Sequence, residues 1–182
     1  MANPFRYEKL ESRWAARRAA GVIGGPNGEG LELRRVPTLA ERVISAPRTV
    51  VWAVLVDEDD ETDIGFHQQI VGAPASGVGA RHVSVGPPSP PFGMRTVMYN
   101  EVTAVQEGYW ITSQMLAGSW EHIETFFLLD AADGQTLARI TGWWTKPAPR
   151  TADFSSLQAT LNGLAAKALD RVARRAEKIR PA

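Results

Sequence analysis

The stretch from Glu41 to Asp57, ERVISAPRTVVWAVLVD, limits what this chain can fold into more than any other. The residues before its proline suit an edge strand with one solvated face. Ser45 can cap a helix, and Pro47 fits a first helical turn, where the backbone N–H has no intrahelical partner. The β-branched residues from Thr49 to Val56 suit a buried strand as well as a helix. The residues alone therefore predict a strand and a sharp turn, followed by either a short helix or a second strand.

Downstream, from Gln68 to Trp144, segments rich in β-branched and aromatic residues are separated by turn residues. This pattern predicts successive antiparallel hairpins, and with the strand before Pro47 it gives about seven strands. We expect the later strands at 68–72, 81–85, 94–105, 109–117, 120–130 and 136–145. The proline-rich run at 87–91 favours a stiff loop, because proline cannot continue a strand ladder.

The last element is predicted to be a helix from about Ala152 to Ile179. Its apolar residues recur at helical spacing, and charged residues occupy much of the remaining surface. A helix of this kind must bury one face, and a curved sheet offers a surface for it. Asn162 lies within the helix and is a candidate polar contact to a ligand.

The first 30 residues are expected to be an appendage to a main domain at 31–182. Residues 5–20 predict an amphipathic helix with Tyr7, Leu10 and Trp14 at helical spacing and several basic side chains. The glycine-rich stretch from Gly21 to Gly30 predicts a flexible linker. A basic helix can meet a membrane surface or an acidic partner. Docking on the domain, or on a second subunit of a homodimer, is the favoured interpretation.

Composition excludes several classes of function. The chain has 20 basic and 20 acidic residues, so its charge gives no reason to expect nucleic acid as a partner. It has no cysteine, and the acidic run from Asp57 to Asp63 lacks the ligand spacing of an EF-hand loop, so no metal site is expected. No phosphate-binding or dinucleotide motif indicates a cofactor. Neither a membrane span nor a signal peptide is indicated, and a cytoplasmic protein is expected.

The order of several short motifs resembles one known family. The first motif is Ala46-Pro47, followed by a Val-Trp pair and a closing Leu-Val-Asp. Three more follow in order: Gly79-Ala80-Arg81, then Glu101-Val102-Thr103, then Phe127 to Asp130 with a turn after it. Over about 37–179 this order resembles the polyketide cyclase/dehydrase-like (SRPBCC) branch of the START/Bet v 1-like superfamily. The resemblance implies an α+β helix-grip fold, in which a curved antiparallel sheet of about seven strands wraps a long C-terminal helix around an internal cavity. It also decides for a helix after Pro47.

The same resemblance places a binding site in that cavity, lined by one face of the sheet. Along 94–105, pattern alone turns the more apolar set containing Met98 and Asn100 inward, whereas the related aromatase/cyclases favour Tyr99 and Glu101 inward. On the second choice, which we adopt as the expectation, Glu101 or His82 transfers protons and Tyr99 orients a carbonyl. The remaining residues expected to contact a ligand are Ser84, Trp110, Gln114, His122, Glu124, Trp143, Trp144 and Asn162.

His122 and Glu124 share one face of a predicted strand. They could form an acid–base dyad, but a solvated pair is the favoured interpretation.

Two functions fit these expectations. One is a cavity enzyme of bacterial secondary metabolism, which cyclises or aromatises a polyketide-like chain by positioning and proton transfer. The alternative is a non-catalytic carrier or sensor of a hydrophobic ligand that is polyketide-, isoprenoid- or lipid-like. A chaperone-interaction module is a third class, because the fold does not fix the function. The acidic run followed by Phe66 stands where many relatives carry a tryptophan, which weakens the case for cyclase activity.

Overall fold

The computed structural model describes residues 31–57, 67–70, 77–89, 93–117 and 120–179. The predicted N-terminal helix, the glycine-rich linker and most of the acidic run lie outside the described residues. The strands are β1 (Leu31–Ile44), β2 (His67–Ile70), β3 (Arg81–Ser89), β4 (Met94–Gln106), β5 (Trp110–Ala117), β6 (Trp120–Asp130) and β7 (Thr136–Pro149). The helices are α2 (Arg48–Leu55), the short 3-10 helix η1 (Ala132–Gly134) and α3 (Ser155–Ala176).

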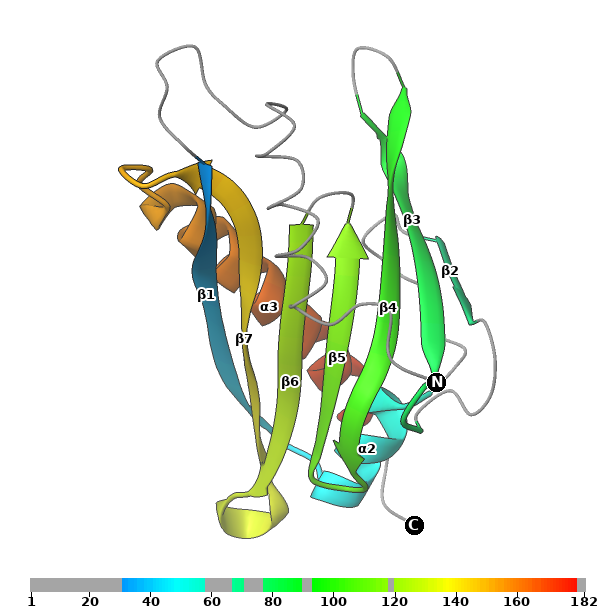
Figure 1. Ribbon diagram of the computed structural model, residues 1–182. Coiled ribbons are helices and arrows are strands. Elements are labelled where there is room, and N and C mark those ends of the chain that lie inside the picture. The colour runs from blue at the N-terminus through cyan, green and yellow to red at the C-terminus, as the bar shows by residue number, and fades with distance from the viewer. Residues whose placement is uncertain (1–30, 58–66, 71–76, 90–92, 118–119, 180–182) are drawn as a thin grey trace.

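The strands form one antiparallel sheet in the order β1-β7-β6-β5-β4-β3-β2. Helix α3 crosses one face of this sheet diagonally, from the β1–β7 end toward α2 (Figure 1). We call the face toward α3 the inner face and the opposite face the outer face. The predicted α+β class, with an antiparallel sheet and a long C-terminal helix, is confirmed.

The hydrophobic core fills one part of the space between the inner face and α3. Small side chains of the helix, Ala165, Ala173 and Ala176, are buried against the sheet together with Leu169. Alanine at these positions lets the helix backbone approach the strands closely. The sheet and α2 complete this core with Ala40, Ile44, Ala46, Val51, Val54, Leu128, Ala138 and Ile140.

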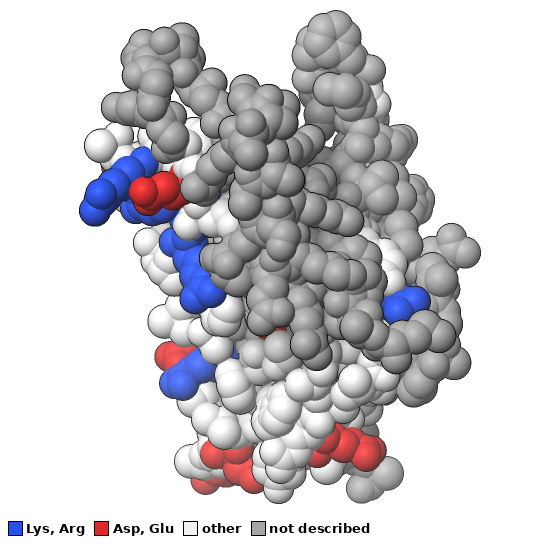
Figure 2. Space-filling model, viewed as in Figure 1, with Lys and Arg blue, Asp and Glu red and all other residues white. Residues whose placement is uncertain are grey.

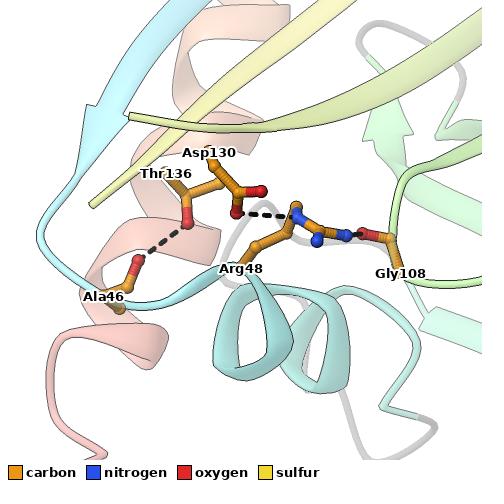
Figure 3. A network of polar contacts seen from close by, with 5 residues as sticks. All are labelled: Ala46, Arg48, Gly108, Asp130 and Thr136. Atoms are coloured by element: carbon orange, nitrogen blue, oxygen red, sulfur yellow. Dashed lines mark hydrogen bonds and ion pairs between the residues drawn. The ribbon is translucent and has the colours of Figure 1, made fainter. Parts of the chain in front are cut away.

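A network of polar contacts ties α2 to the hairpins beneath it (Figure 3). Arg48, the first residue of α2, donates through Nε to Asp130 Oδ1 at 2.9 Å and through Nη1 to the Gly108 carbonyl at 2.7 Å. Its guanidinium carbon also lies 3.8 Å from the centre of the Tyr109 ring. Because a guanidinium presents several donors in a fixed plane, one side chain joins the start of α2 to the β4–β5 turn and to the end of β6.

Three strands extend well beyond their predicted bounds. β1 begins at Leu31, well before the predicted edge strand, because it pairs with β7 along its whole length. β7 runs on through Pro147 to Pro149, and β3 continues past a register shift through Pro88. At these prolines each strand is paired on one edge only, so the missing N–H breaks no hydrogen bond to a second neighbouring strand. Part of the predicted proline loop is therefore strand.

Charged side chains are unevenly distributed over the outer face of the described residues (Figure 2). Lys and Arg lie along the edge formed by β1 and β7, where the guanidinium carbon of Arg35 lies 5.0 Å from the centre of the Trp143 ring. Asp and Glu gather at the end that carries η1, where Asp130 and Asp133 are exposed. The separation of positive and negative side chains is not complete, because the basic edge also contains the Arg139–Glu41 ion pair.

Two glycines are expected to respond oppositely to the same substitution. A Cβ at Gly142 in β7 would lie 2.0 Å from the Ile123 carbonyl oxygen, whereas a Cβ at Gly163 in α3 would have no neighbour within 4 Å. Gly142→Ala should lower the free energy of unfolding by about 1–3 kcal/mol or more, since rigid backbone must shift. Gly163→Ala should raise it by up to about 1 kcal/mol, because alanine is the better helix former.

Urea denaturation of the two variants beside the parent protein measures both effects. A Gly142→Ala variant as stable as the parent would contradict the close approach of β6 and β7 at this position.

Candidate functional site

A pocket of about 710 Å³ lies between α3 and the inner face, next to the hydrophobic core. Its floor comes from β4 to β7, β1 contributes at one side, and α3 forms the opposite wall. The apolar lining consists of Met98, Met115, Trp144, Leu161, Leu164, Ala165 and Ala168. Here the alanine and leucine side chains of α3 and the strand residues opposite them do not fill the space between the helix and the sheet.

Polar side chains on the pocket floor are buried without hydrogen bonds. Thr38 Oγ1, Asn100 Oδ1 and His122 Nε2 have no hydrogen-bond partner among the described residues. All three residues line the pocket, and the strand register places Asn100 and His122 on either side of Met115. A buried polar atom without a partner costs about 1–3 kcal/mol. The floor of the pocket therefore has unused hydrogen-bonding capacity.

His122 and Glu124 form the centre of this polar group. The His122 ring stacks on the Trp144 ring, with centroids 4.3 Å apart and planes 9° from parallel. His122 Nε2 and Glu124 Oε2 are 3.5 Å apart, and the two side chains are 8% and 25% exposed. Burial lowers the pKa of His122 to about 4 and raises the pKa of Glu124 to about 7. Near neutral pH the imidazole is therefore uncharged, and the carboxyl group is divided between its two protonation states.

The wall formed by α3 adds charge to the pocket. Lys167, Arg171 and Arg174 line it, together with Asp170. Asp170 forms an ion pair with Arg42 of β1. The charged groups of α3 that border the pocket are thus mainly basic, and they stand opposite the floor that carries Glu124.

Three of the predicted site residues lie together in this pocket, namely His122, Glu124 and Trp144. The favoured interpretation of His122 and Glu124 as a solvated pair is corrected, because His122 is 7% exposed and both residues line the pocket under α3. Alternation along β6 and the presence of α3 over these positions explain their burial.

Other predicted residues occupy the outer face. Tyr99 and Glu101 alternate with the pocket-lining Met98 and Asn100 in β4, and Gln114 pairs with Glu101 across the sheet. This placement differs from the expectation that Tyr99 and Glu101 face the cavity. The more apolar set, which pattern alone turned inward, is the one beneath α3, because that face must pack against the helix. Glu101 Oε2 instead lies 3.7 Å from Arg81 Nε, and Gln114 Nε2 donates to Glu121 Oε1.

The remaining tryptophans and Asn162 also have contacts outside the pocket lining. Trp110 Nε1 donates to Gln106 Oε1 at 2.8 Å, and Trp143 lies on the outer face beneath Arg35. Asn162 Oδ1 accepts a hydrogen bond from the Leu39 N–H at 3.0 Å, so it ties α3 to the edge strand β1.

Two predicted residues are placed by strand register. His82 is opposite Asn100 and Ser84 is opposite Met98, so both positions on β3 neighbour residues that line the pocket. Asn100, Ser113 and Thr38 also line the pocket and were not predicted as ligand contacts. Asn100 belongs to the more apolar set of β4, so the alternation pattern carried the signal for it. Ser113 and Thr38 had none, because short polar residues are ordinary in exposed strands.

Comparisons with known proteins identify the fold. No family model matches the chain, and no curated protein matches it. One similar structure is a norcoclaurine synthase from Thalictrum flavum, solved with a transition-state analogue. It is 15% identical to this chain with a TM-score of 0.60, and the match covers 81% of this chain and 97% of the synthase chain. Ara h 8.0201 is 12% identical with a TM-score of 0.57, covering 80% of this chain and 97% of its own. The chain has a Bet v 1-like fold. An uncharacterised protein from Rhizobium leguminosarum shares it at 14% identity and a TM-score of 0.57, over 82% of this chain and 99% of its own.

These structures confirm the fold that the sequence resemblance implied. Two further observations concern the described residues. None of their helices is long and apolar enough to cross a membrane, and they contain no cluster of three or more side chains suited to hold a metal ion.

Glu124→Gln is expected to change how stability depends on pH. The pKa of Glu124 is raised from 4.5 to about 7, so between these values the folded protein keeps a proton that the unfolded chain has lost. The free energy of unfolding therefore falls as pH rises through this range, by roughly 3 kcal/mol in total. Because glutamine does not titrate, the variant should not show this fall in the free energy of unfolding.

Urea denaturation of parent and variant at pH 5 and pH 8 tests this expectation. The variant should gain stability relative to the parent mainly at pH 8. His122 has a lowered pKa and costs both proteins stability as pH falls from 6.5 toward 4, so the comparison at one pH removes its contribution. An equal difference at both pH values would contradict the burial of an ionisable carboxyl group at this position.

Proposed function

We propose that this protein binds a hydrophobic small molecule in the pocket between α3 and the inner face. The observation that carries the proposal is the set of buried polar atoms without hydrogen bonds, on Thr38, Asn100 and His122, in a mainly apolar lining. A ligand with a few oxygen or nitrogen atoms would supply the missing partners. Apolar contact would then provide most of the affinity, and the polar atoms would fix the orientation.

The shape of the pocket favours a flat or elongated ligand. Its volume of about 710 Å³ falls within the range of roughly 300–1,000 Å³ that is usual for small-molecule sites. The stacked rings of His122 and Trp144 present a flat wall on one side, and flat aromatic walls suit polycyclic, polyketide-like or isoprenoid compounds. A lipid-like chain could also lie along the row formed by Leu161, Leu164 and Ala168.

A catalytic role is the second candidate function, and the His122–Glu124 pair favours it. An enzyme needs a group whose pKa lies near the working pH, and Glu124 meets this requirement. The sequence resemblance to polyketide cyclases supports the same direction, and one protein with this fold is by name a synthase. A carrier or sensor would use the pocket without this pair. Fold alone does not choose between the two.

The binding function can be tested with two matched substitutions on α3. Ala168 lines the pocket, whereas Ala166 is exposed two residues away on the same helix. Ala168→Phe should fill part of the pocket and raise the Kd for Nile red, a neutral hydrophobic dye. Losing about 60 Å² of apolar contact corresponds to roughly tenfold in Kd. Ala166→Phe should bind the dye like the parent protein.

Fluorescence titration gives the three dissociation constants, and circular dichroism confirms that the variants are folded. Equal affinities for all three proteins, or no saturable binding by the parent, would overturn the proposed pocket. Native mass spectrometry of the purified protein would identify a ligand that remains bound, and Ala168→Phe should release it.

A further inference from the structure

The carboxyl group of Glu124 lies among groups that suit proton transfer. On β6 it neighbours His122, with 3.5 Å between Oε2 and Nε2. Across the sheet, the register pairs Glu124 with Ser113 of β5 on one side and with Gly142 of β7 on the other. Ser113 also lines the pocket. A carboxyl group, an imidazole and a hydroxyl group are therefore brought to one patch of the pocket floor.

We propose that Glu124 is a catalytic residue, which exchanges a proton with the carbon next to the carbonyl group of a hydrophobic ketone bound in this pocket. The inference rests on the proposed binding function and names the chemical class of the substrate. A carbonyl group is required because a carboxylate is a weak base. It can remove a carbon-bound proton only where the resulting charge is delocalised onto an oxygen.

The proton transfer balances without any other reactant. The Glu124 carboxylate takes the proton from the carbon next to the carbonyl, and the electron pair of that C–H bond forms the C=C bond of an enolate. The carbonyl oxygen gains the negative charge, and the Ser113 hydroxyl and the Asn100 amide are the donors on the same floor that can stabilise it. Return of a proton from Glu124, to the same carbon or to another one, completes an exchange or an isomerisation.

The surroundings of Glu124 suit this chemistry. Burial raises its pKa to about 7, so it is a stronger base than an exposed glutamate and still ionises near neutral pH. The pKa of His122 is lowered to about 4, so the neighbouring imidazole stays neutral and does not hold the carboxylate in a permanent ion pair. The charged groups that border the pocket from α3 are Lys167, Asp170, Arg171 and Arg174, with Arg42 of β1 paired to Asp170.

Glu101 provides a matched comparison on the other face of the same sheet. It is also buried, at 8% exposure, but it lies near Arg81 and opposite Gln114 on the outer face. Glu101→Gln therefore removes a buried carboxylate of the same kind without touching the pocket.

The test measures deuterium incorporation into 2-tetralone, a hydrophobic ketone with activated protons beside its carbonyl group. Displacement of Nile red first gives the Kd of the ketone for the full-length parent, for Glu124→Gln and for Glu101→Gln. Proton NMR in deuterated buffer then gives the exchange rate, corrected for buffer alone. The parent should accelerate exchange, with a rate that rises through pH 7 and levels off above it.

Glu124→Gln should bind 2-tetralone within about twofold of the parent and exchange it roughly 100-fold more slowly, which is the usual contribution of general base catalysis. Glu101→Gln should keep both the affinity and the rate. Dye and ketone binding without exchange by the parent, or equal exchange by Glu124→Gln, would overturn the catalytic role and leave the binding function intact. Failure of 2-tetralone to displace the dye would overturn the ketone assignment. Failure of the dye itself to bind would instead overturn the proposed function.

Discussion

The packing of α3 against only part of the curved sheet determines the rest of this structure. At its C-terminal half, Leu169, Val172, Ala173 and Ala176 meet the sheet and α2 in a continuous core. Beside this core, α3 residues between Leu161 and Arg174 border a space of about 710 Å³ between the helix and the sheet. A closed apolar core over the whole helix would be more stable, since buried apolar surface contributes about 25 cal/mol per Å². The end of the sheet near α2 is thus closed by the core, and the part of the sheet next to it is left open to a ligand.

Local contacts hold the two ends in this arrangement. Arg48 fixes the start of α2 to the β4–β5 turn and to Asp130, so the closed end of the sheet is tied together by one side chain (Figure 3). At the other side Asn162 accepts a hydrogen bond from the edge strand, which sets the position of α3 beside the pocket. Gly142 lets β6 and β7 approach where Glu124 lies. Each contact constrains the backbone around the pocket.

Sequence reasoning predicted the class of fold more completely than the site. The turn at Pro47, the successive hairpins and the amphipathic last helix are local patterns, so they could be recognised without tertiary information. For the inward face of β4 the local pattern and the family resemblance disagreed, and both sets of alternating residues contain polar and apolar members. Apolar pattern favoured Met98 and Asn100 beneath α3, and the structure agrees with it, whereas family resemblance favoured Tyr99 and Glu101. Thr38 and Ser113 reach the pocket only through the pairing of distant strands, which no local pattern records.

The polar residues of the pocket floor carry a cost that the fold alone does not explain. An unpartnered buried polar atom costs about 1–3 kcal/mol, and a domain is stable by only about 5–15 kcal/mol in total. Three such atoms, on Thr38, Asn100 and His122, together with a partly buried carboxyl group of raised pKa on Glu124, therefore consume a sizeable part of that stability. Other buried polar atoms without a hydrogen bond, on Glu101, Trp143 and Thr145, lie outside the pocket lining. Apolar residues at the pocket positions would remove the cost and close the core. The polar groups that line the pocket and weaken the folded state are better explained by what they bind than by what they stabilise.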